Sequence, residues 1–396
     1  MFTGEKFRLL SNEKVRLADW HKGIREIIKQ LDETNIRIFT SMWKYGPRNI
    51  LEVSRRTGIP FTSVYHRVAK LERKSGRVAT LAPQIAQLGM IRVVVLATAS
   101  PGADDKVTAA LKLPNLWRSV DRCEGNYTHL SIHYVPIKFL SQFKKYLRRL
   151  SDLGLVTQCK TILTGEYVPS FPDFSYYNPD TNQWLFAWSE WLAALKKKPT
   201  KTIEDPASYA VKVDKKDLLI IKELQKNARR SFADLAPILG ISLQGVKYHF
   251  DKKLIPSGIV KYYGFDVWPY PEEVSAYHEI LLEFTNKQAM NQFFSLVEDL
   301  FFVLGVAKVL HQNALLVRTY TLQTQVASLF AFLSQMARQG SLKTYSSVRQ
   351  SFISREAQSI SYELFEDDVG WTFDLKKNLS ALSKLARMTT VPQKAL

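Results

Sequence analysis

One structural unit occurs twice in this chain, and the internal repeat limits its fold more than any other feature. Residues 31–78 align with residues 213–260 without a gap, and 11 of the 48 aligned positions are identical. The Gly-Ile pairs at 58–59 and 240–241 coincide, and apolar residues recur at helical spacing in both segments. Because turn glycines and the helix period recur together, the pattern indicates a duplicated structural unit.

The repeat continues beyond this segment. The strand-like residues 91–100 match 277–286, and residues 127–135 match 313–321, both at an offset of 186. The segments 182–188 and 369–375 also resemble each other, with a tryptophan at the third position of each. We therefore interpret the chain as two copies of a unit of about 185 residues.

The first part of each copy contains three helical patterns. Helices are predicted over 31–44, 50–57 and 61–74, and again over 214–227, 231–239 and 243–253. A Gly-Ile turn separates the second helix from the third, which is the spacing of a helix-turn-helix. A Ser-Gly pair and a short strand follow each third helix. We interpret these two strands as wings.

The second part of each copy alternates strand and helix. In the first copy the pattern predicts strand 91–99, helix 103–112, strands 115–122 and 127–135, helix 137–151 and strand 154–163. In the second it predicts strand 276–285, helix 287–299, strands 301–309 and 313–320, helix 321–338 and strand 341–350. The order βαββαβ is typical of a ferredoxin-like domain. The predicted fold class is α+β: a tandem repeat of a winged helix-turn-helix and a ferredoxin-like βαββαβ domain, each copy ending in a tail helix.

The predicted organisation has seven parts. They are an N-terminal extension (1–30), winged helix-turn-helix one (31–82), βαββαβ domain one (88–165), an aromatic helix with linker (166–210), winged helix-turn-helix two (211–268), βαββαβ domain two (274–352) and a C-terminal tail (353–396).

The charge of the chain favours a polyanionic partner. Lys and Arg number 55 against 37 Asp and Glu, which gives a net charge of +18. Such an excess is typical of binding to nucleic acid or to an anionic membrane surface. The first residues are too charged for a signal peptide, and apolar runs such as 90–99 are too short to span a bilayer. With only two cysteines, no disulfide framework is expected. We therefore expect a cytoplasmic, nucleoid-associated protein that does not engage a membrane.

The third helix of each helix-turn-helix is the predicted DNA-contacting element. The second helix of such a motif enters the major groove, where polar side chains meet base edges and cations meet phosphates. Val64, Val68 and Leu71 are expected inside the first domain, and Val246 and Phe250 inside the second. The predicted DNA-binding residues are Thr62, Ser63, Tyr65, His66, Arg67, Lys70, Arg73, Lys74, Gln244, Lys247, Tyr248, His249 and Lys252. A solvated basic face without DNA contact is the alternative.

These motifs resemble a known family. The segment "VDKKDLLIIKELQKNARRSFADLAPILGIS" (213–242) resembles the opening of Lrp/AsnC (feast/famine) transcription regulators, and "VYHRVAKLE" (64–72) resembles the end of their recognition helix. The βαββαβ parts resemble their regulatory domain. The resemblance implies DNA binding as a dimer or higher oligomer, with small-molecule effectors at interfaces between regulatory domains. Two units in one chain would make an internal pseudo-dimer with unlike reading heads.

Two other functions stay open. Some haem-pathway decarboxylases resemble Lrp/AsnC units and bind a tetrapyrrole between subunits, and His129, His133 and His311 keep this reading open. The third possibility is an architectural or partner-recruiting protein that binds DNA without sequence preference. No carboxylate or cysteine cluster accompanies His129 and His133 at ligand spacing, so we interpret them as buried or interface residues and expect no metal. The regulator hypothesis requires no cofactor and no catalysis.

An aromatic segment follows the first βαββαβ pattern. In residues 184–198, Trp184, Trp188, Trp191 and Leu195 fall on one stripe at helical spacing. A basic end beside an aromatic stripe can indicate docking on a membrane surface. A helix packed against its own protein or a partner is the interpretation we favour.

Overall fold

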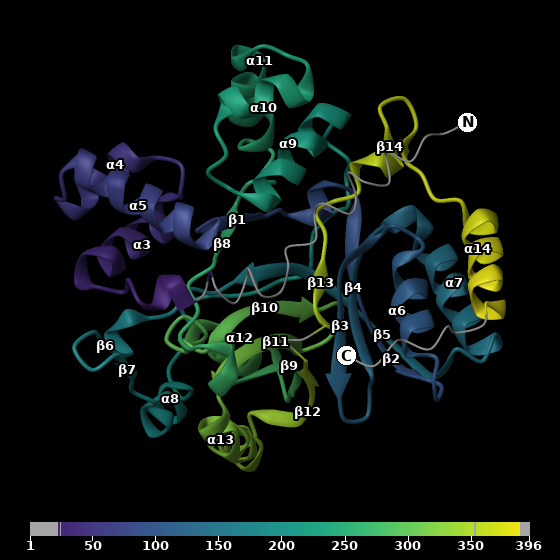
Figure 1. Ribbon diagram of the computed structural model, residues 1–396. Coiled ribbons are helices and arrows are strands. Elements are labelled where there is room, and N and C mark those ends of the chain that lie inside the picture. The colour runs from purple at the N-terminus through teal and green to yellow at the C-terminus, as the bar shows by residue number, and fades with distance from the viewer. Residues whose placement is uncertain (1–22, 24, 352–353, 389–396) are drawn as a thin grey trace.

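The computed structural model describes residues 23, 25–351 and 354–388 (Figure 1). Most of the predicted N-terminal extension and the end of the C-terminal tail lie outside these residues. The predicted α+β class and tandem arrangement are confirmed. Head one, residues 33–82, contains α3 (Glu33–Tyr45), α4 (Ile50–Thr57) and α5 (Phe61–Ser75). Head two, residues 215–265, contains α9 (Lys215–Lys226), α10 (Phe232–Leu239) and α11 (Leu243–Tyr248).

The predicted wings are wrong in one respect. Strand β1 (Ala79–Ala82) pairs antiparallel with β8 (Tyr262–Phe265), so the single strand of each head finds its partner in the other head. Each copy supplies only one strand at this place, and its backbone N–H and C=O groups need partners. The two strands form a ribbon between the heads, visible at the centre of Figure 1.

The βαββαβ order is present in both copies. Copy one has β2 (Met90–Ala99), α6 (Asp104–Lys112), β3 (Trp117–Glu124), β4 (His129–Pro136), α7 (Leu140–Asp152) and β5 (Val156–Pro169). Copy two has β9 (Ser275–Phe284), α12 (Lys287–Leu296), β10 (Val303–Val309), β11 (Ala314–Leu322), α13 (Val326–Arg338) and β12 (Leu342–Gln350).

The two four-stranded sheets join into one closed sheet. The strand order is β12-β9-β11-β10-β5-β2-β4-β3, where β10 pairs with β5 and β12 pairs with β3. A short strand from the tail of copy two, β13 (Glu356–Ala357), adds to β3. Helices α6 and α7 pack on the outside of copy one, and α12 and α13 on the outside of copy two (Figure 1). The joined sheet therefore encloses an interior shared by both copies.

The strand register corrects one part of the repeat alignment. Arg92 pairs with Tyr134 and Tyr277 pairs with Tyr320, while Tyr134 and Tyr320 are equivalent at an offset of 186. Arg92 is therefore equivalent to Tyr277, at an offset of 185, and the predicted 186 for this strand is one residue too large. The difference matters because a slip of one residue moves every side chain to the other face of a strand.

Charged side chains in the shared interior connect the two copies. Arg92 Nη2 lies 3.8 Å from Glu279 Oε1, and Arg318 Nε lies 2.8 Å from Glu279 Oε2. Arg355 Nε lies 3.6 Å from Asp121 Oδ1. Arg92 and Asp121 belong to copy one, whereas Glu279 and Arg355 belong to copy two. Because buried charges need partners, these pairs make each copy depend on the other.

The two tails also cross between copies. The tail of copy one has β6 (Tyr177–Asn178), β7 (Gln183–Trp184) and α8 (Trp188–Ala194), and that of copy two has β14 (Phe365–Glu366), β15 (Gly370–Trp371) and α14 (Leu375–Arg387). The equivalent indoles Trp184 and Trp371 donate hydrogen bonds to the carbonyls of Pro269 (3.0 Å) and Leu88 (2.7 Å), each in the other copy.

The helix predicted to start at Trp184 starts four residues later, because Trp184 lies in the hairpin. Its ring stacks on Phe301 at 4.5 Å, and Trp191 of α8 is fully buried. The aromatic segment thus packs against its own protein. No helix in the described part of the chain is long and apolar enough to cross a membrane.

Candidate nucleic-acid interface

A glycine turn orients the third helix in each head. Gly58 and Gly240 end the second helices with φ of 69° and 63°, a region that favours glycine. Val64 and Val68 of α5 are buried as predicted, and so are Val246 and Phe250 in head two. With one side of each third helix held in the core, the opposite side is presented to solvent.

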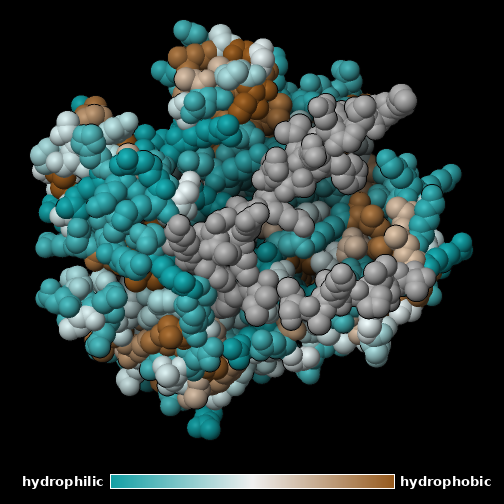
Figure 2. Space-filling view, viewed as in Figure 1, coloured by the Kyte–Doolittle hydropathy of each residue, from teal (hydrophilic) through white to brown (hydrophobic). Residues whose placement is uncertain are grey.

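Eleven of the thirteen predicted DNA-binding residues are exposed, and two are partly buried. The exposed residues are Thr62, Ser63, Tyr65, His66, Lys70, Arg73 and Lys74 in head one and Gln244, Lys247, Tyr248 and Lys252 in head two. Figure 2 shows head one as largely hydrophilic, while hydrophobic atoms gather at the α10–α11 end of head two.

Arg67 and His249, at equivalent positions, are the partly buried pair. Arg67 Nη1 lies 2.7 Å from Asp32 Oδ2 and 3.2 Å from Asn35 Oδ1. His249 Nδ1 lies 2.7 Å from Asp217 Oδ1, the equivalent of Asn35. Both side chains therefore tie the third helix to the start of the first helix, and the structure gives them a role inside the head.

The third helix of head two departs from the predicted continuous helix 243–253. It changes after Tyr248 into a π-helical turn, His249–Leu254. Lys253 is equivalent to the buried Leu71, but the wider turn puts Leu254 into the core instead. Lys253 points outward, with Nζ 2.6 Å from Asp214 Oδ2.

Several cations on the third helices have no acidic partner. Of the described residues, none places a carboxylate oxygen within 4.0 Å of Lys70, Lys247 or Lys252. Arg73 bonds only to the carbonyl of Ala69 in its own helix, at 3.4 Å, among the described contacts. Such side chains are available for phosphates, because no intramolecular ion pair must break first.

Sequence reasoning missed one pair of residues at this surface. Phe61 and Leu243 occupy the first position of α5 and α11 and are 47% exposed in both heads. They are equivalent in the repeat, and large apolar side chains in the first turn of a third helix can contact thymine methyl groups. The available signal was their position two residues after each Gly-Ile pair, where a core residue would not be expected.

The heads are braced against each other. Arg48 Nη1 donates to the carbonyls of Ala228 (2.7 Å) and Arg230 (2.8 Å), and its guanidinium lies 4.4 Å from the Phe232 ring centre. In return, Arg229 Nε lies 2.8 Å from Glu72 Oε1. These contacts hold the two third helices in one arrangement.

One group of side chains in head two has the composition of a metal site. Ligand atoms of Asp214, Asp217 and His249 lie within 4.8 Å of one another. Lys253 Nζ already lies 2.6 Å from Asp214 and 3.8 Å from Asp217. Burial is the largest single effect and raises the pKa of Asp214, but the hydrogen bonds from Lys253 and the Asp217 N–H together with the Lys253 charge outweigh it, so the net pKa is lowered. The lysine ammonium supplies the positive charge, so the group is explained as a cap of α9.

The three histidines behind the decarboxylase hypothesis lie in different places. His129 Nε2 lies 3.0 Å from Thr108 Oγ1 on α6, and His133 packs on Phe143 of α7 at 4.9 Å. Both are fully buried on the helix side of the sheet, and burial lowers their pKa values to about 4 and about 3. His311 is 88% exposed at the β10–β11 hairpin. These histidines do not converge on one site.

Comparison with known proteins gives the following results. A family described as winged helix-turn-helix DNA-binding matches residues 213–261. The crystal structure of the siroheme decarboxylase NirDL has a TM-score of 0.53 and 12% identity, covering 85% of this chain and 94% of that chain. Its complex with an iron-uroporphyrin III analogue has a TM-score of 0.50 and 10% identity, covering 89% and 100%. An AsnC-family regulatory protein from Pyrococcus furiosus is 14% identical over 34% of this chain and 88% of that one, with a TM-score of 0.28. No curated protein matches.

The class of architecture follows from the fold and these matches. The chain consists of two similar units, each a helix-turn-helix followed by a ferredoxin-like βαββαβ domain, and the winged helix-turn-helix family matches the second of them. Their tandem arrangement is that of NirDL. At 10–12% identity the likeness concerns the fold.

Proposed function

We propose that the protein binds double-stranded DNA through both third helices and acts as a transcription regulator with two unlike reading heads. The observation that supports this most is the pair of exposed helix faces. Lys70 in head one and its equivalent Lys252 in head two are exposed and free of carboxylates among the described residues. On both helices, exposed polar and apolar side chains lie N-terminal to these lysines. The first turns of a recognition helix are the part that contacts base edges in the major groove.

A second candidate is an enzyme or binding protein for a tetrapyrrole, and the comparisons favour it. Two solved structures with TM-scores of 0.53 and 0.50 are those of the siroheme decarboxylase NirDL, one of them in complex with an iron-uroporphyrin III analogue. Tetrapyrroles of this class carry several carboxylates, which a chain of net charge +18 would attract. Because His129, His133 and His311 do not lie in one site, we assign no binding or catalytic residues to this candidate.

One pair of measurements distinguishes the two candidates. DNA binding is followed by fluorescence anisotropy between 50 and 200 mM salt. With about 6–10 phosphate contacts, affinity should fall roughly 10³–10⁵-fold. In parallel, the protein is titrated with iron-uroporphyrin III and its Soret band is recorded. A flat salt response together with a saturable Soret shift would reject the regulator and support the second candidate.

The matched variants are Lys70→Ala with Lys252→Ala, and Lys145→Ala on the exposed side of α7 as control. The double variant should weaken DNA binding at every sequence and lower the salt slope by about 2, since each phosphate contact contributes about 1. The control should bind DNA as the unmodified protein does. Equal loss in both would mean that only overall charge matters.

A further inference from the structure

The outer surface of copy one is formed by helices of both copies. Helix α14, from the tail of copy two, lies beside α7 (Figure 1), and its Leu382 is buried in the same hydrophobic cluster as Phe143 and Leu147 of α7. Lys106 Nζ of α6 donates to the Ala386 carbonyl at 3.1 Å. The outward sides of Leu140–Asp152 and Leu375–Arg387 therefore form one continuous surface, which we call the α7–α14 face.

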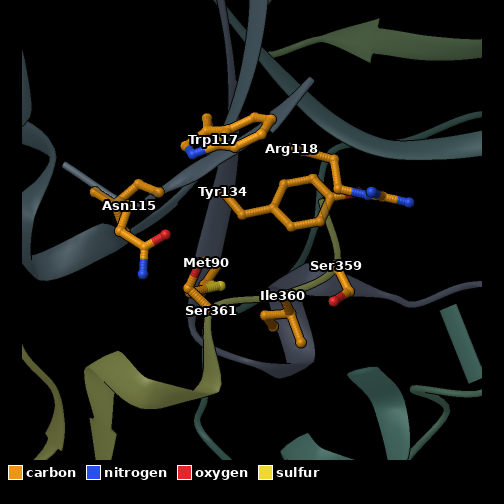
Figure 3. Close-up of a pocket in the computed structure, with 9 residues that line it drawn as sticks. Met90, Asn115, Trp117, Arg118, Tyr134, Ser359, Ile360 and Ser361 are labelled. Atoms are coloured by element: carbon orange, nitrogen blue, oxygen red, sulfur yellow. The ribbon is translucent and has the colours of Figure 1, made fainter. Parts of the chain in front are cut away.

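The tail reaches α7 by crossing the sheet of copy one in close contact. Figure 3 shows the Tyr134 ring between Trp117 of β3 and Ile360 of the tail. Gln358 Nε2 donates to the Trp117 carbonyl at 2.8 Å. The cavity left at this crossing is about 10 Å³, which is room for a single water. The close crossing and the buried Leu382 hold α14 on copy one at both ends of this part of the tail.

The α7–α14 face is densely cationic. Asp152 is the one carboxylate within the two helices, and it lies 3.7 Å from Arg149. For the other cations of the face, none of the described residues places a carboxylate oxygen within 4.0 Å. Six of the cations are exposed and two are half-buried: Lys145, Arg148, Lys376, Lys377, Lys384 and Arg387, and then Lys144 and Arg149.

The equivalent surface of copy two lacks these charges. The four buried residues of α7 and the four of α13 fall at equivalent positions, at an offset of 186, so both helices pack in the same way. The cations between them differ: Lys144, Lys145, Arg148 and Arg149 correspond to Phe330, Ala331, Ser334 and Gln335. Lys376 and Lys377 of α14 correspond to Ser189 and Glu190 of α8. The fold therefore does not require cations here, and they are a property of the surface of copy one.

We propose that the α7–α14 face binds the phosphates of a second double-stranded DNA segment, without regard to base sequence. Cations that have no intramolecular partner can each replace a counterion at a phosphate. The exposed hydroxyls of Ser141 and Ser380 lie among them and can donate to phosphate oxygens.

The side chains around the cations favour a duplex over other polyanions. Within the two described helices no aromatic residue is exposed, so the bases of a single strand would have nothing to stack on. The large apolar side chains of both helices pack on the core, whereas a helix that lies on a membrane inserts such side chains among the lipids.

The position of the face implies that one molecule joins two DNA segments. Figure 1 places α7 and α14 at the opposite edge of the molecule from head one, so a short duplex held by the heads does not reach them. A single change such as Lys145→Ala therefore leaves binding at the heads unchanged. The joining of segments rests on the proposed function, whereas binding at the α7–α14 face depends on its own cations.

The first experiment measures joining of two duplexes. One duplex is immobilised through biotin, the protein is bound to it, and capture of a second, dye-labelled duplex is recorded. The face variant combines Arg148→Gln, Lys376→Gln, Lys377→Gln and Lys384→Gln, all at exposed positions. The control removes the same charge from other exposed positions, with Lys196→Gln, Lys197→Gln, Lys198→Gln and Lys343→Gln. The face variant should capture about tenfold less of the second duplex, because phosphate contacts are lost, and the control should capture as much as the unmodified protein. Equal capture by the face variant, or equal loss in the control, would overturn the proposal.

The second experiment separates the face from the heads. Random-sequence duplex is titrated against protein with Lys70→Ala and Lys252→Ala. Binding should persist, and adding the four changes of the face variant should lower its salt slope by up to about 4, since each phosphate contact contributes about 1. An unchanged slope would overturn the α7–α14 face and leave the heads as proposed. If the two head changes have no effect while the face changes abolish binding, the proposed function is rejected and the face is retained.

Vesicles that contain phosphatidylserine complete this test. They should not bind to the protein through the α7–α14 face. Vesicle binding that is lost in the face variant, together with unchanged duplex binding, would assign the face to a membrane and overturn the DNA proposal.

Discussion

At the scale of single residues, the two heads use different side chains at one equivalent position to connect the third helix to the first helix. Arg67 and His249 both connect the third helix to an acidic or amide group at the start of the first helix. In the sequence, both residues fall on the side of the third helix that carries the other cations, and they were predicted to contact DNA. A one-dimensional pattern cannot show that Asp32 and Asp217 lie opposite them, because these residues are more than 30 positions away.

This difference leads to a prediction for Arg67 and Lys70. Arg67→Ala should lower stability by no more than about 1 kcal/mol, since the Asp32 pair is largely exposed, and should change DNA affinity little. Lys70→Ala should leave stability unchanged and weaken DNA binding, because Lys70 has no described intramolecular partner. Urea denaturation and anisotropy measure the two effects. A larger loss of DNA binding in Arg67→Ala than in Lys70→Ala would show that the Asp32 pair opens on DNA.

The buried histidines predict a pH dependence of stability. Burial lowers the pKa of His129 to about 4, of His133 to about 3 and of His278 to about 4. The unfolded chain takes up these protons near pH 6.5, so stability is complete above that pH. Below it, each histidine costs about 1.4 kcal/mol per pH unit until its folded pKa is reached.

Urea denaturation at pH 7.5, 6 and 5 measures this loss. His133→Asn should reduce the slope between pH 6 and 5 by about one proton. Equal slopes in the variant and the unmodified protein would contradict the assigned burial of His133.

At the scale of elements, periodicity predicted which helices and strands exist, and long-range pairing decided the rest. The helix predicted over 50–57 has those bounds, and strand 91–99 begins one residue early. The pairing of β1 with β8 was not predicted, because the partner of each strand lies in the other copy, far away in the sequence. The π-helical turn was not predicted, because an ordinary helix was assumed. An ordinary helix would place Lys253 at a core position, whereas the π-helical turn does not. At the candidate DNA surface, the exposure of the polar and basic residues followed from the helical period, while Phe61 and Leu243 were not predicted because they are apolar.

The seam between the copies gives a prediction at this scale. Gly305 of β10 has a φ of 153°, and a Cβ there would meet the Tyr167 ring and the Val168 carbonyl of β5 at 2.5–2.6 Å. Gly305→Ala should therefore cost about 1–3 kcal/mol or more, as overpacking does. Gly245→Ala, a helical glycine whose Cβ would have contacts of 3.4 Å or longer, should not destabilise. Thermal denaturation compares them, and equal melting temperatures would contradict the close β10–β5 contact.

At the scale of the whole molecule, the fusion makes two copies that cannot be interchanged. Glu279 is equivalent to Val94, and Arg318 is equivalent to Ile132, so the interior ion pairs occur only once. The reading residues differ in the same way: Thr62, Ser63 and Tyr65 correspond to Gln244, Gly245 and Lys247. The equivalent strands β1 and β8 nevertheless pair antiparallel, so the ribbon between the heads has an approximate two-fold axis. We therefore expect one molecule to contact two half-sites of different sequence.

Selection of bound sequences from a random DNA pool tests whether both heads read DNA. Two unlike heads should enrich a composite site, with two unlike half-sites about one helical turn (roughly 34–36 Å) or a multiple apart. Gln244→Ala with Lys247→Ala should relax one half-site, by on the order of 1–3 kcal/mol per contacted base pair, and leave the other intact. Recovery of a perfect palindrome that persists in this variant would contradict reading by head two, and no enrichment at all would contradict sequence-specific DNA binding.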